Sequence, residues 1–344
     1  MSNFEKSVAK TWLPDTPTFL NLHPPTPKWT QIKSDNQRHL ELWKTLESLF
    51  SESFQLFRLE TSQTGLKGYY RLKSGSNDFF LRVMSQDRFD RFQEEEQVLS
   101  FLRKRNIPLL HTIAPHDISI KPDLYVAFQP FLEAHFFNPN VDSLGDVGNC
   151  LSQIHKTLKT FPHDNIKARG QLRHEQLIQI LRNRQGLAEV APPELMSLLS
   201  SSQESDLLPL IESPQAIHGD LNLANILFSQ KGCTFIDFED TLCSWLNPML
   251  DVAMVLERFI LTMDYPDRKK HALDFISNYG HQSFDPEKIC RILKAMSLRA
   301  LLLLINKSLR DRSPLSAEAR KFVFLNEQIK KNRSFLQSVQ DRLK

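Results

Sequence analysis

One short stretch of the sequence holds the residue types that phosphoryl transfer needs. It begins with His218-Gly219-Asp220, reaches Asn225 five residues after the aspartate, and continues to Asp237 beyond an apolar run. A carboxylate can orient an attacking hydroxyl or accept its proton, and a second carboxylate with an amide oxygen can hold Mg²⁺. The spacing therefore predicts one of the two carboxylates, Asp220 or Asp237, beside an acceptor hydroxyl, and the other carboxylate with the Asn225 amide as metal ligands.

The apolar residues around these positions predict the element that holds them. Residues 226–228 and 234–236 read as two short strands of a buried hairpin. Such a hairpin would fix the polar groups at its ends. Asp and Asn are also ordinary turn residues, so a turn network without chemistry is the alternative interpretation. The chemical interpretation is favoured because the surrounding elements fit it too.

Glycine is scarce, with ten residues in a chain of 344. Neither G-x-x-x-x-G-K-[ST] nor G-x-G-x-x-G can be written from their positions. These are the patterns of the P-loop proteins and of the common dinucleotide-binding fold, so both classes are excluded. If this chain binds a phosphate, it does so with little glycine.

The overall charge gives no whole-chain nucleic-acid footprint, since 43 basic residues stand against 40 acidic ones. The more basic stretch after residue 300 is interpreted as a solvated helical face and not as a polyanion-binding patch. The four cysteines form no C-x-x-C pair, which favours a reducing, cytoplasmic compartment. No secretory signal and no apolar run of membrane-spanning length is present. We therefore expect neither nucleic acid nor membrane as a partner, and the oligomeric state is open.

The spacing of apolar residues predicts a β-rich first part and a helical second part. After an irregular, proline-rich arm over residues 1–33, we expect a helix over 34–50, strands over 54–59, 69–73, 79–84 and 124–128, and a helix over 89–105. Helical patterns follow over 144–158, 174–184, 193–199, 249–263, 286–308 and 317–343. The prediction is an α+β fold with an N-terminal arm and the start of a helix in 1–45, a small β-rich N-lobe in 46–132 and a larger, mostly helical C-lobe in 133–344.

The chemical stretch resembles the catalytic core of the aminoglycoside phosphotransferase and choline kinase-like family, whose fold is that of the protein kinases. The family pattern H-G-D-x-x-x-x-N followed by I-D-[FW]-E matches at His218, Gly219, Asp220, Asn225, Ile236, Asp237, Phe238 and Glu239. Asp251 begins a segment in the place of the family's D-L-A, where the carboxylate is expected to hold the backbone of the catalytic loop. The resemblance implies a bilobal, protein-kinase-like fold.

The resemblance extends into the N-lobe. Gly65 and Gly68, on either side of Lys67, resemble the nucleotide-covering loop; Lys67 would then touch a phosphate, with an exposed turn lysine as the alternative. Arg82 stands where the familiar kinases carry a lysine, and Glu95 resembles the glutamate that pairs with it. Arginine differs from lysine in reach but can contact a phosphate with two donors. The resemblance thus implies Arg82, oriented by Glu95, on the nucleotide phosphates.

Two further elements match the family. Residues Gln129 to Phe131 resemble the hinge whose backbone groups meet adenine, although Pro130 has no N–H to donate. The helix that ends at His155 resembles the L-x-x-L-H element, and we expect a packed, structural histidine there. The matches cover about residues 50–260 and leave both ends of the chain without a counterpart.

The resemblance implies an ATP-dependent phosphotransferase that moves the γ-phosphate to a hydroxyl of a small molecule, with ATP and Mg²⁺ as cofactors. Asp220 would position the acceptor, and His218, in the same loop, is the second residue expected to be catalytic. The expected acceptor is an amino-alcohol, an amino sugar, a sugar or a similar alcohol. A cationic acceptor would meet carboxylates and aromatic rings such as Glu257 and Phe259, unless these are surface charges and core rings.

Two other functions stay open. A nucleotide-binding pseudokinase or regulatory scaffold is suggested by Arg82, by the sparse glycines and by the unusual arm. A kinase that acts on proteins is the other alternative, but no A-P-E-like segment follows Asp237, and little room remains for an activation loop before Asp251. The small-molecule kinase is therefore the function we adopt.

Overall fold

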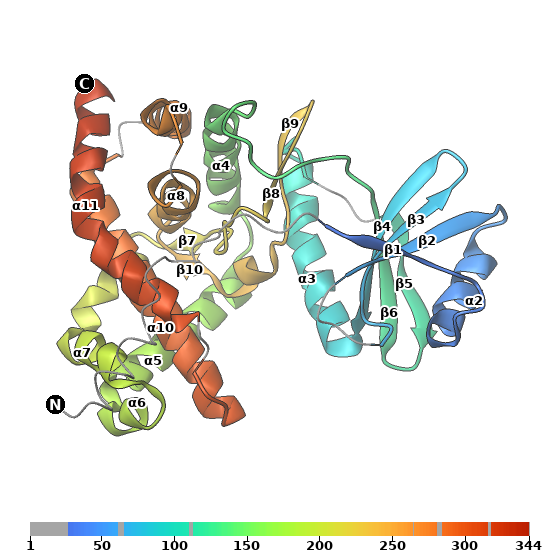
Figure 1. Cartoon of the computed structure of the whole chain (residues 1–344), viewed down its shortest axis with the longest axis horizontal. Coiled ribbons are helices and arrows are strands. Elements are labelled where there is room, and N and C mark those ends of the chain that lie inside the picture. The colour runs from blue at the N-terminus through green and yellow to red at the C-terminus, as the bar shows by residue number, and fades with distance from the viewer. Residues whose placement is uncertain are drawn as a thin grey trace, which may run out of the picture. The chain divides into compact units, whose positions relative to one another are not determined.

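The computed structural model describes residues 27–60, 65–109, 113–263, 265–280, 284–315 and 318–343. These residues form two compact units (Figure 1). The first, called the β unit, lies within Pro25–Phe136 and Asn225–Leu242; the second, called the helical unit, lies within Phe137–Ala224 and Cys243–Lys344. Most of the proline-rich arm falls outside the described residues.

The β unit is built on a six-stranded antiparallel sheet with the strand order β1-β2-β3-β4-β6-β5. The strands are β1 (Trp29–Ile32), β2 (Phe54–Leu59), β3 (Gly68–Ser74), β4 (Asn77–Ser85), β5 (Ile113–Lys121) and β6 (Leu124–Pro130). The four predicted strands are confirmed, but β1 and β5 were not expected. Both lie at the edges of the sheet, where strands need no clean alternation; β5 contains Pro115 and two register shifts against β6.

The β3–β4 hairpin brings the cationic strand residue into place. Ser74 pairs with Asn77, so only Gly75 and Ser76 form the loop. Gly75 has a φ of +56°, which the tight connection requires and which glycine adopts without strain. The predicted turn is confirmed, and it sets the register in which Arg82 faces Tyr69 across the hairpin.

Helices complete the β unit. Helix α2 (Leu40–Leu49) buries Leu42 and Leu46 in the same core as the sheet residues Leu56, Tyr70 and Leu81. Helix α3 (Gln86–Arg103) follows β4 directly and buries six side chains, of which Glu95 alone is charged. The hairpin β8 (Ile226–Ser229) and β9 (Gly232–Phe235) belongs to this unit as well, through bridges to residues 109 and 135.

The helical unit confirms the helical second part of the sequence. It contains α4 (Leu144–Leu158), α5 (Asp164–Arg182), α6 (Arg184–Val190), α7 (Pro193–Ser201), α8 (Met249–Val255), α9 (Arg268–Gly280), α10 (Pro286–Asp311) and α11 (Ala319–Leu343), with the two-residue strands β7 (Gln215–Ala216) and β10 (Trp245–Leu246) paired to each other. Helix α4 packs on α9, and α10 packs on α11. The helix expected over 249–263 is divided, because a π-helical segment, Leu256–Leu261, follows α8.

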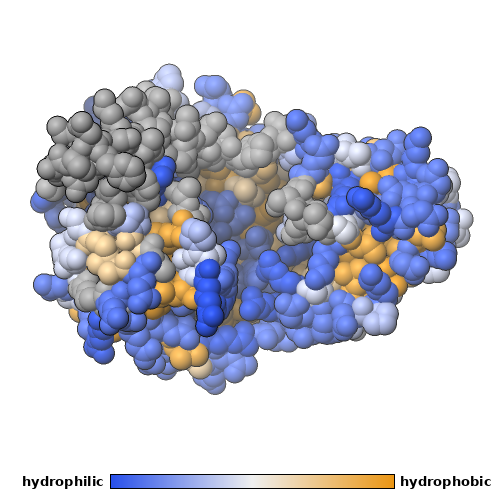
Figure 2. Space-filling model, turned by 60° about the horizontal axis from the view of Figure 1, so that its bottom comes forward, coloured by the Kyte–Doolittle hydropathy of each residue, from blue (hydrophilic) through white to orange (hydrophobic). Residues whose placement is uncertain are grey.

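The chain keeps its apolar residues in these cores. On the face drawn in Figure 2, hydrophilic residues cover most of the described surface, and apolar residues appear in patches among them. All four cysteines are free thiols. None of the described helices combines the length and the hydropathy that crossing a membrane would need.

Candidate active site

A buried carboxylate in the helical unit holds the loop that carries Asp220. Asp251, on α8, is fully buried; its Oδ2 accepts the His218 N–H and its Oδ1 accepts the Gly219 N–H, both at 2.9 Å. Burial alone would raise the pKa of Asp251, but the hydrogen bond from His155 and the nearby donors hold that pKa below its ordinary value. The carboxylate therefore stays ionised and fixes the backbone immediately before Asp220, as expected.

His155 is a structural residue, as the sequence predicts. Its Nε2 lies 2.9 Å from Asp251 Oδ2, and its Nδ1 lies 2.9 Å from the hydroxyl of Tyr279 on α9. Because a carboxylate only accepts, Nε2 carries the proton, and Nδ1 accepts from the tyrosine hydroxyl. Burial raises the pKa of Tyr279, which keeps that hydroxyl a donor. The chain Tyr279–His155–Asp251 thus ties α9, α4 and α8 to the loop.

The Asp220 carboxylate is held by two side chains. Arg258 donates from Nη1 to Asp220 Oδ1 at 3.1 Å and to the Leu221 carbonyl at 3.0 Å, while Asn222 donates to Asp220 Oδ2 at 3.0 Å. Arg258 belongs to the π-helical segment, a type of widened turn that is frequent at functional sites. No sequence motif marks this arginine, because it lies 38 positions from Asp220.

His218 lies inside the loop and not on its surface. Its side chain is fully buried, and its Nδ1 is 3.4 Å from the amide nitrogen of Asp220. Asp220 itself keeps 38% of its side chain exposed. The Asp220 carboxylate is therefore accessible, whereas the side chain of His218, which was expected to be catalytic, is closed off from solvent.

The acidic and aromatic residues considered for a cationic acceptor are largely structural. Glu257 and Phe259 are buried at 3% and 0% exposure, and the Tyr265 hydroxyl donates to the Phe259 carbonyl. Burial raises the pKa of Glu257 to about 7, against the influence of Arg258 and Lys321. Phe259 is a core ring, as the alternative states, but Glu257 is a buried charge and not a surface charge.

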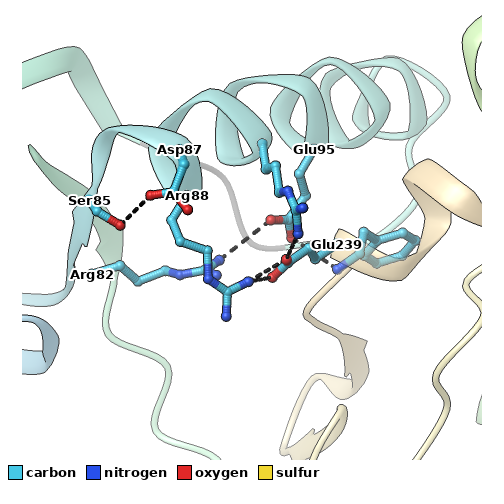
Figure 3. Close-up of polar contacts among 8 residues, drawn as sticks. Arg82, Ser85, Asp87, Arg88, Glu95 and Glu239 are labelled. Atoms are coloured by element: carbon cyan, nitrogen blue, oxygen red, sulfur yellow. Dashed lines mark hydrogen bonds and ion pairs between the residues drawn. The ribbon is translucent and has the colours of Figure 1, made fainter. Parts of the chain in front are cut away.

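The β unit brings together the pair expected to hold the nucleotide phosphates. Arg82, on β4, points toward Glu95 of α3, with Nη1 at 3.6 Å from Glu95 Oε2 (Figure 3). Glu95 Oε1 accepts the backbone N–H of Phe238 at 2.9 Å. Burial raises the pKa of Glu95 to about 7, while Arg82 acts in the opposite direction. Glu95 thus links β4 to the segment that carries Asp237.

Asn225 and Asp237 flank the β8–β9 hairpin. The Asn225 carbonyl accepts the Ile236 N–H at 3.0 Å, which closes the hairpin next to Asp237. Asp237 has a φ of +62°, in the left-handed region, and its charge acts on both Arg82 and Glu95. An amide oxygen and a carboxylate suit Mg²⁺, which takes few protein ligands and completes its shell with water and phosphate. Among the described residues, no group of three His, Cys, Asp or Glu side chains could hold a metal by itself.

A cavity of about 460 Å³ opens beside Arg82 in the β unit. Three cations and two carboxylates line it: Lys67, Arg82, Arg88, Glu95 and Glu239. The predicted covering-loop lysine therefore faces the same space as Arg82. Gly65, with a φ of +73°, shapes the turn before it, and no atom crowds the position of a Cβ there.

Glu239 has two partners on α3 that the sequence analysis did not identify. Its carboxylate pairs with Arg88 and lies 3.3 Å from Arg91 Nη1 (Figure 3). Positions 88 and 91 are one helical turn apart, so both side chains leave the same face of α3. A pattern of basic residues three apart is common on exposed helices, which is why it carried no signal.

The hinge residues sit at the end of β6. Gln129 is buried, and the Phe131 N–H donates to the Asp78 carbonyl at 2.9 Å. The Phe131 ring also lies under the Arg71 guanidinium, 3.7 Å from its centre. Because the Phe131 amide is engaged and Pro130 has none, this end of β6 has few donors left for an adenine ring.

Comparison with known proteins places these features in one family. The model of the APH family, described as the phosphotransferase enzyme family, matches residues 65–288, which is more than half of the chain. Comparison with curated protein sequences gives no match.

Several solved structures are similar to the chain. The choline kinase LicA from Streptococcus pneumoniae is 16% identical, with 86% of this chain and 99% of that chain covered and a TM-score of 0.52. Spectinomycin phosphotransferase APH(9)-Ia, in complex with ADP and spectinomycin, is 13% identical, with coverage of 86% and 98% and a TM-score of 0.53. An aminoglycoside phosphotransferase from Alicyclobacillus acidocaldarius is 14% identical, with coverage of 82% and 92% and a TM-score of 0.50. The expected kinase-like α+β fold is confirmed.

Proposed function

Since the chain belongs to the phosphotransferase enzyme family, we propose that it transfers the γ-phosphoryl group of ATP to a hydroxyl group of a small molecule. One observation carries the proposal. Asp251 accepts the His218 and Gly219 amides at 2.9 Å, so the loop presents a partly exposed Asp220 at a fixed place. A turn network without chemistry would not need a buried, ionised carboxylate behind it, because such a charge is costly to bury.

Asp220 is the residue proposed to meet the acceptor. It orients the hydroxyl for in-line attack and receives its proton as the bond from the hydroxyl oxygen to the γ-phosphorus forms; the bond from that phosphorus to the bridging oxygen breaks, and ADP leaves. With one oxygen held by Arg258 and the other by Asn222, the carboxylate is fixed in orientation. Positioning of this kind supplies much of the rate in phosphoryl transfer. His218 supports the loop from inside.

The β unit is proposed to hold the nucleotide. Arg82 contacts the phosphates and Glu95 orients it, with Lys67 and Gly65 in the covering loop and Gln129 and Phe131 near the adenine. Asn225 and Asp237 would hold Mg²⁺, which neutralises phosphate charge when it is bound. Asp237 acts electrostatically on Arg82, so the proposed metal ligand and the proposed phosphate cation belong to one site.

The roles of the chain's parts follow from this proposal. In this proposal residues 46–132 form the nucleotide-covering lobe and residues 133–344 carry the catalytic loop and the acceptor site; of the arm proposed for residues 1–45, Trp29–Ile32 joins the sheet as β1. The acceptor class is an amino-alcohol, an amino sugar, a sugar or a similar alcohol. The cytoplasm is the proposed compartment, since four free thiols suit reducing conditions.

The proposal is tested with labelled ATP and a metabolite extract, followed by identification of the labelled product. Asp220→Ala should abolish transfer while ATP binding survives, and Asp237→Ala should weaken Mg²⁺-dependent nucleotide binding as well. Asp142→Ala, at a half-buried aspartate that accepts the Asn138 N–H in a turn of the helical unit, serves as the control and should keep both properties. Full turnover by the Asp220→Ala protein would refute the assignment.

The same experiment separates the alternative of a pseudokinase or regulatory scaffold. A scaffold would bind ATP with the wild-type site but would release no labelled product with any acceptor. A protein kinase would label polypeptides in an unfractionated extract and not small molecules. Labelling of one small alcohol alone supports the proposed function.

A further inference from the structure

A second arginine faces the cavity beside Arg82. Arg88 lies in the first turn of α3 and lines the cavity together with Lys67 and Arg82. Its Nη1 contacts both carboxylate oxygens of Glu239, and Figure 3 shows the side chain extending from the helix toward that carboxylate. The side chain is 53% exposed, so it is free to change partner without disturbing the core.

Arg91 provides an internal comparison. It lies one turn further along α3 and also contacts Glu239, at 3.3 Å from Oε1. Its side chain is 65% exposed, similar to that of Arg88, but it is not among the residues that line the cavity. The two arginines therefore share a helix and a partner and differ in whether they face the cavity.

The two carboxylates that line the cavity, Glu95 and Glu239, differ in burial and in partners. Glu95 is buried between Arg82 and the Phe238 amide, and it packs into the core of the β unit. Glu239 is more accessible and balances the charge of Arg88. A guanidinium binds carboxylate and phosphate oxygens through the same kind of charge-assisted hydrogen bond, and a phosphate chain carries more charge than one carboxylate. A phosphate oxygen can therefore replace the Glu239 carboxylate as the partner of Arg88.

We propose that Arg88 is a ligand of the nucleotide phosphate chain and exchanges its contact with Glu239 for phosphate oxygens. The inference rests on the proposed function and deepens it, because it adds a second arginine, besides Arg82, that binds the phosphates. It also explains how a covering loop with two glycines can suffice. Cationic side chains from β4 and α3 take over contacts that a glycine-rich loop makes through its backbone.

The test measures the binding of inorganic tripolyphosphate by calorimetry, in EDTA and at fixed low ionic strength. Tripolyphosphate contains the phosphate chain without a base, and EDTA removes any contribution from metal ligands. Arg88→Gln should weaken binding by roughly ten- to a hundredfold, since it removes a charge-assisted contact. Arg91→Gln should weaken it by less than about fivefold, as expected for a screened surface charge.

Glu239→Gln separates a phosphate ligand from a structural ion pair. It breaks the same contact as Arg88→Gln but leaves the arginine and removes a competing negative charge. The proposal requires that this variant bind tripolyphosphate at least as tightly as the wild type. Arg88→Lys keeps the charge and should retain more affinity than Arg88→Gln, which guards against a loss caused by misfolding.

The outcomes are distinct. Equal losses of tripolyphosphate affinity in Arg88→Gln and Glu239→Gln would overturn the proposal, because the Arg88–Glu239 pair would then only order the chain after Asp237. Equal losses in Arg88→Gln and Arg91→Gln would overturn it too, because the arginine that faces the cavity would then differ in no way from the one that does not. Wild-type binding that is unchanged in Arg88→Gln would overturn it as well and leave the proposed function intact. If the wild-type protein bound neither tripolyphosphate nor MgATP, the proposed function would be refuted, and the assignment of Arg88 with it.

Discussion

Arg258 holds Asp220 from a distant part of the chain. Its Nη1 donates to Asp220 Oδ1 at 3.1 Å and also to the Leu221 carbonyl at 3.0 Å, so it binds both the side chain and the backbone of the loop. The arginine side chain is 13% exposed, and its Nε has no hydrogen-bond partner among the residues that the structure describes. A largely buried guanidinium that donates to both the side chain and the backbone of the loop restricts the Asp220 carboxylate to one orientation.

Removing this arginine should impair turnover more than nucleotide binding. In Arg258→Gln the Asp220 carboxylate loses the hydrogen bond from Arg258 Nη1, and misplacement of a reacting group by about 1 Å can cost on the order of a hundredfold in rate. We expect kcat to fall by about ten- to a hundredfold, the KM for ATP to stay within about threefold, and Arg258→Lys to recover part of kcat. Steady-state kinetics with the acceptor from the extract screen measures both constants. A folded Arg258→Gln protein with wild-type kcat would contradict a positioning role.

Asp251→Asn should destabilise the folded chain in a manner that depends on pH. The variant replaces an ionised acceptor of three hydrogen bonds by an amide, and loss of one partner of a buried charged network typically costs about 3–5 kcal/mol. Folding lowers the pKa of Asp251 below 3.8, so the stabilisation is complete above that pH and is lost as the pH falls through the folded pKa. Urea unfolding at neutral pH should separate the two proteins, and the difference should shrink below pH 3.8. A constant difference across that range would contradict the prediction.

Glu95 should make the chain less stable as the pH rises toward neutrality. Folding raises its pKa from 4.5 to about 7, so the folded state binds the proton more tightly than the unfolded state does between these values. The free energy of unfolding therefore falls as the pH rises from 4.5 to about 7, and the loss is constant above that. Glu95→Gln should remove this part of the pH dependence, while Glu257, whose pKa is also raised to about 7, keeps its own part. Urea titrations of both proteins at several pH values within this range measure the difference; identical profiles would refute it.

Gly148→Ala should loosen the contact between α4 and α9. A Cβ at this position would lie 2.3 Å from the Phe275 carbonyl oxygen and 3.0 Å from the Tyr279 nitrogen, both of them backbone atoms that cannot turn away. We expect a loss of about 1–3 kcal/mol in the free energy of unfolding, as for other overpacked sites. Gly145→Ala, on the same helix, is the matched control. Its Cβ meets the flexible side chain of Asn278 at 2.9 Å, so the variant should be nearly neutral in thermal and urea unfolding. Equal losses in the two variants would show that helix packing is not the cause.

Local patterns predicted much of the fold. The β3–β4 hairpin was predictable because Gly75 and its polar neighbours occupy a two-residue turn between apolar runs. Helix α4 was predictable because its apolar residues repeat at helical spacing above the N-cap Ser143. Strands β1 and β5 were not, because each lies at a sheet edge and gains its place from a partner strand and not from its own sequence.

The candidate site likewise has a part that local sequence patterns predict and a part that they do not. The spacing of Asp220, Asn225 and Asp237 is a property of one continuous stretch, and the structure keeps it as a loop followed by a hairpin. The Arg258 contact with Asp220 and the Arg88 contact with Glu239 join residues 38 and 151 positions apart. No periodicity or motif marks such pairs, since each arginine looks like any other helix cation.

The sequence by itself determined which groups are available for chemistry, because the types and the spacing of residues within one stretch are covalent facts. It also excluded the glycine-rich ways of holding phosphate. Only the tertiary structure decided which charges those groups meet: the buried Asp251 behind the loop, Arg258 on Asp220, and Arg88 with Glu239 at the cavity. These partners come from separate helices, and packing of the core, which depends on contacts across the whole chain, brings each of them to its place.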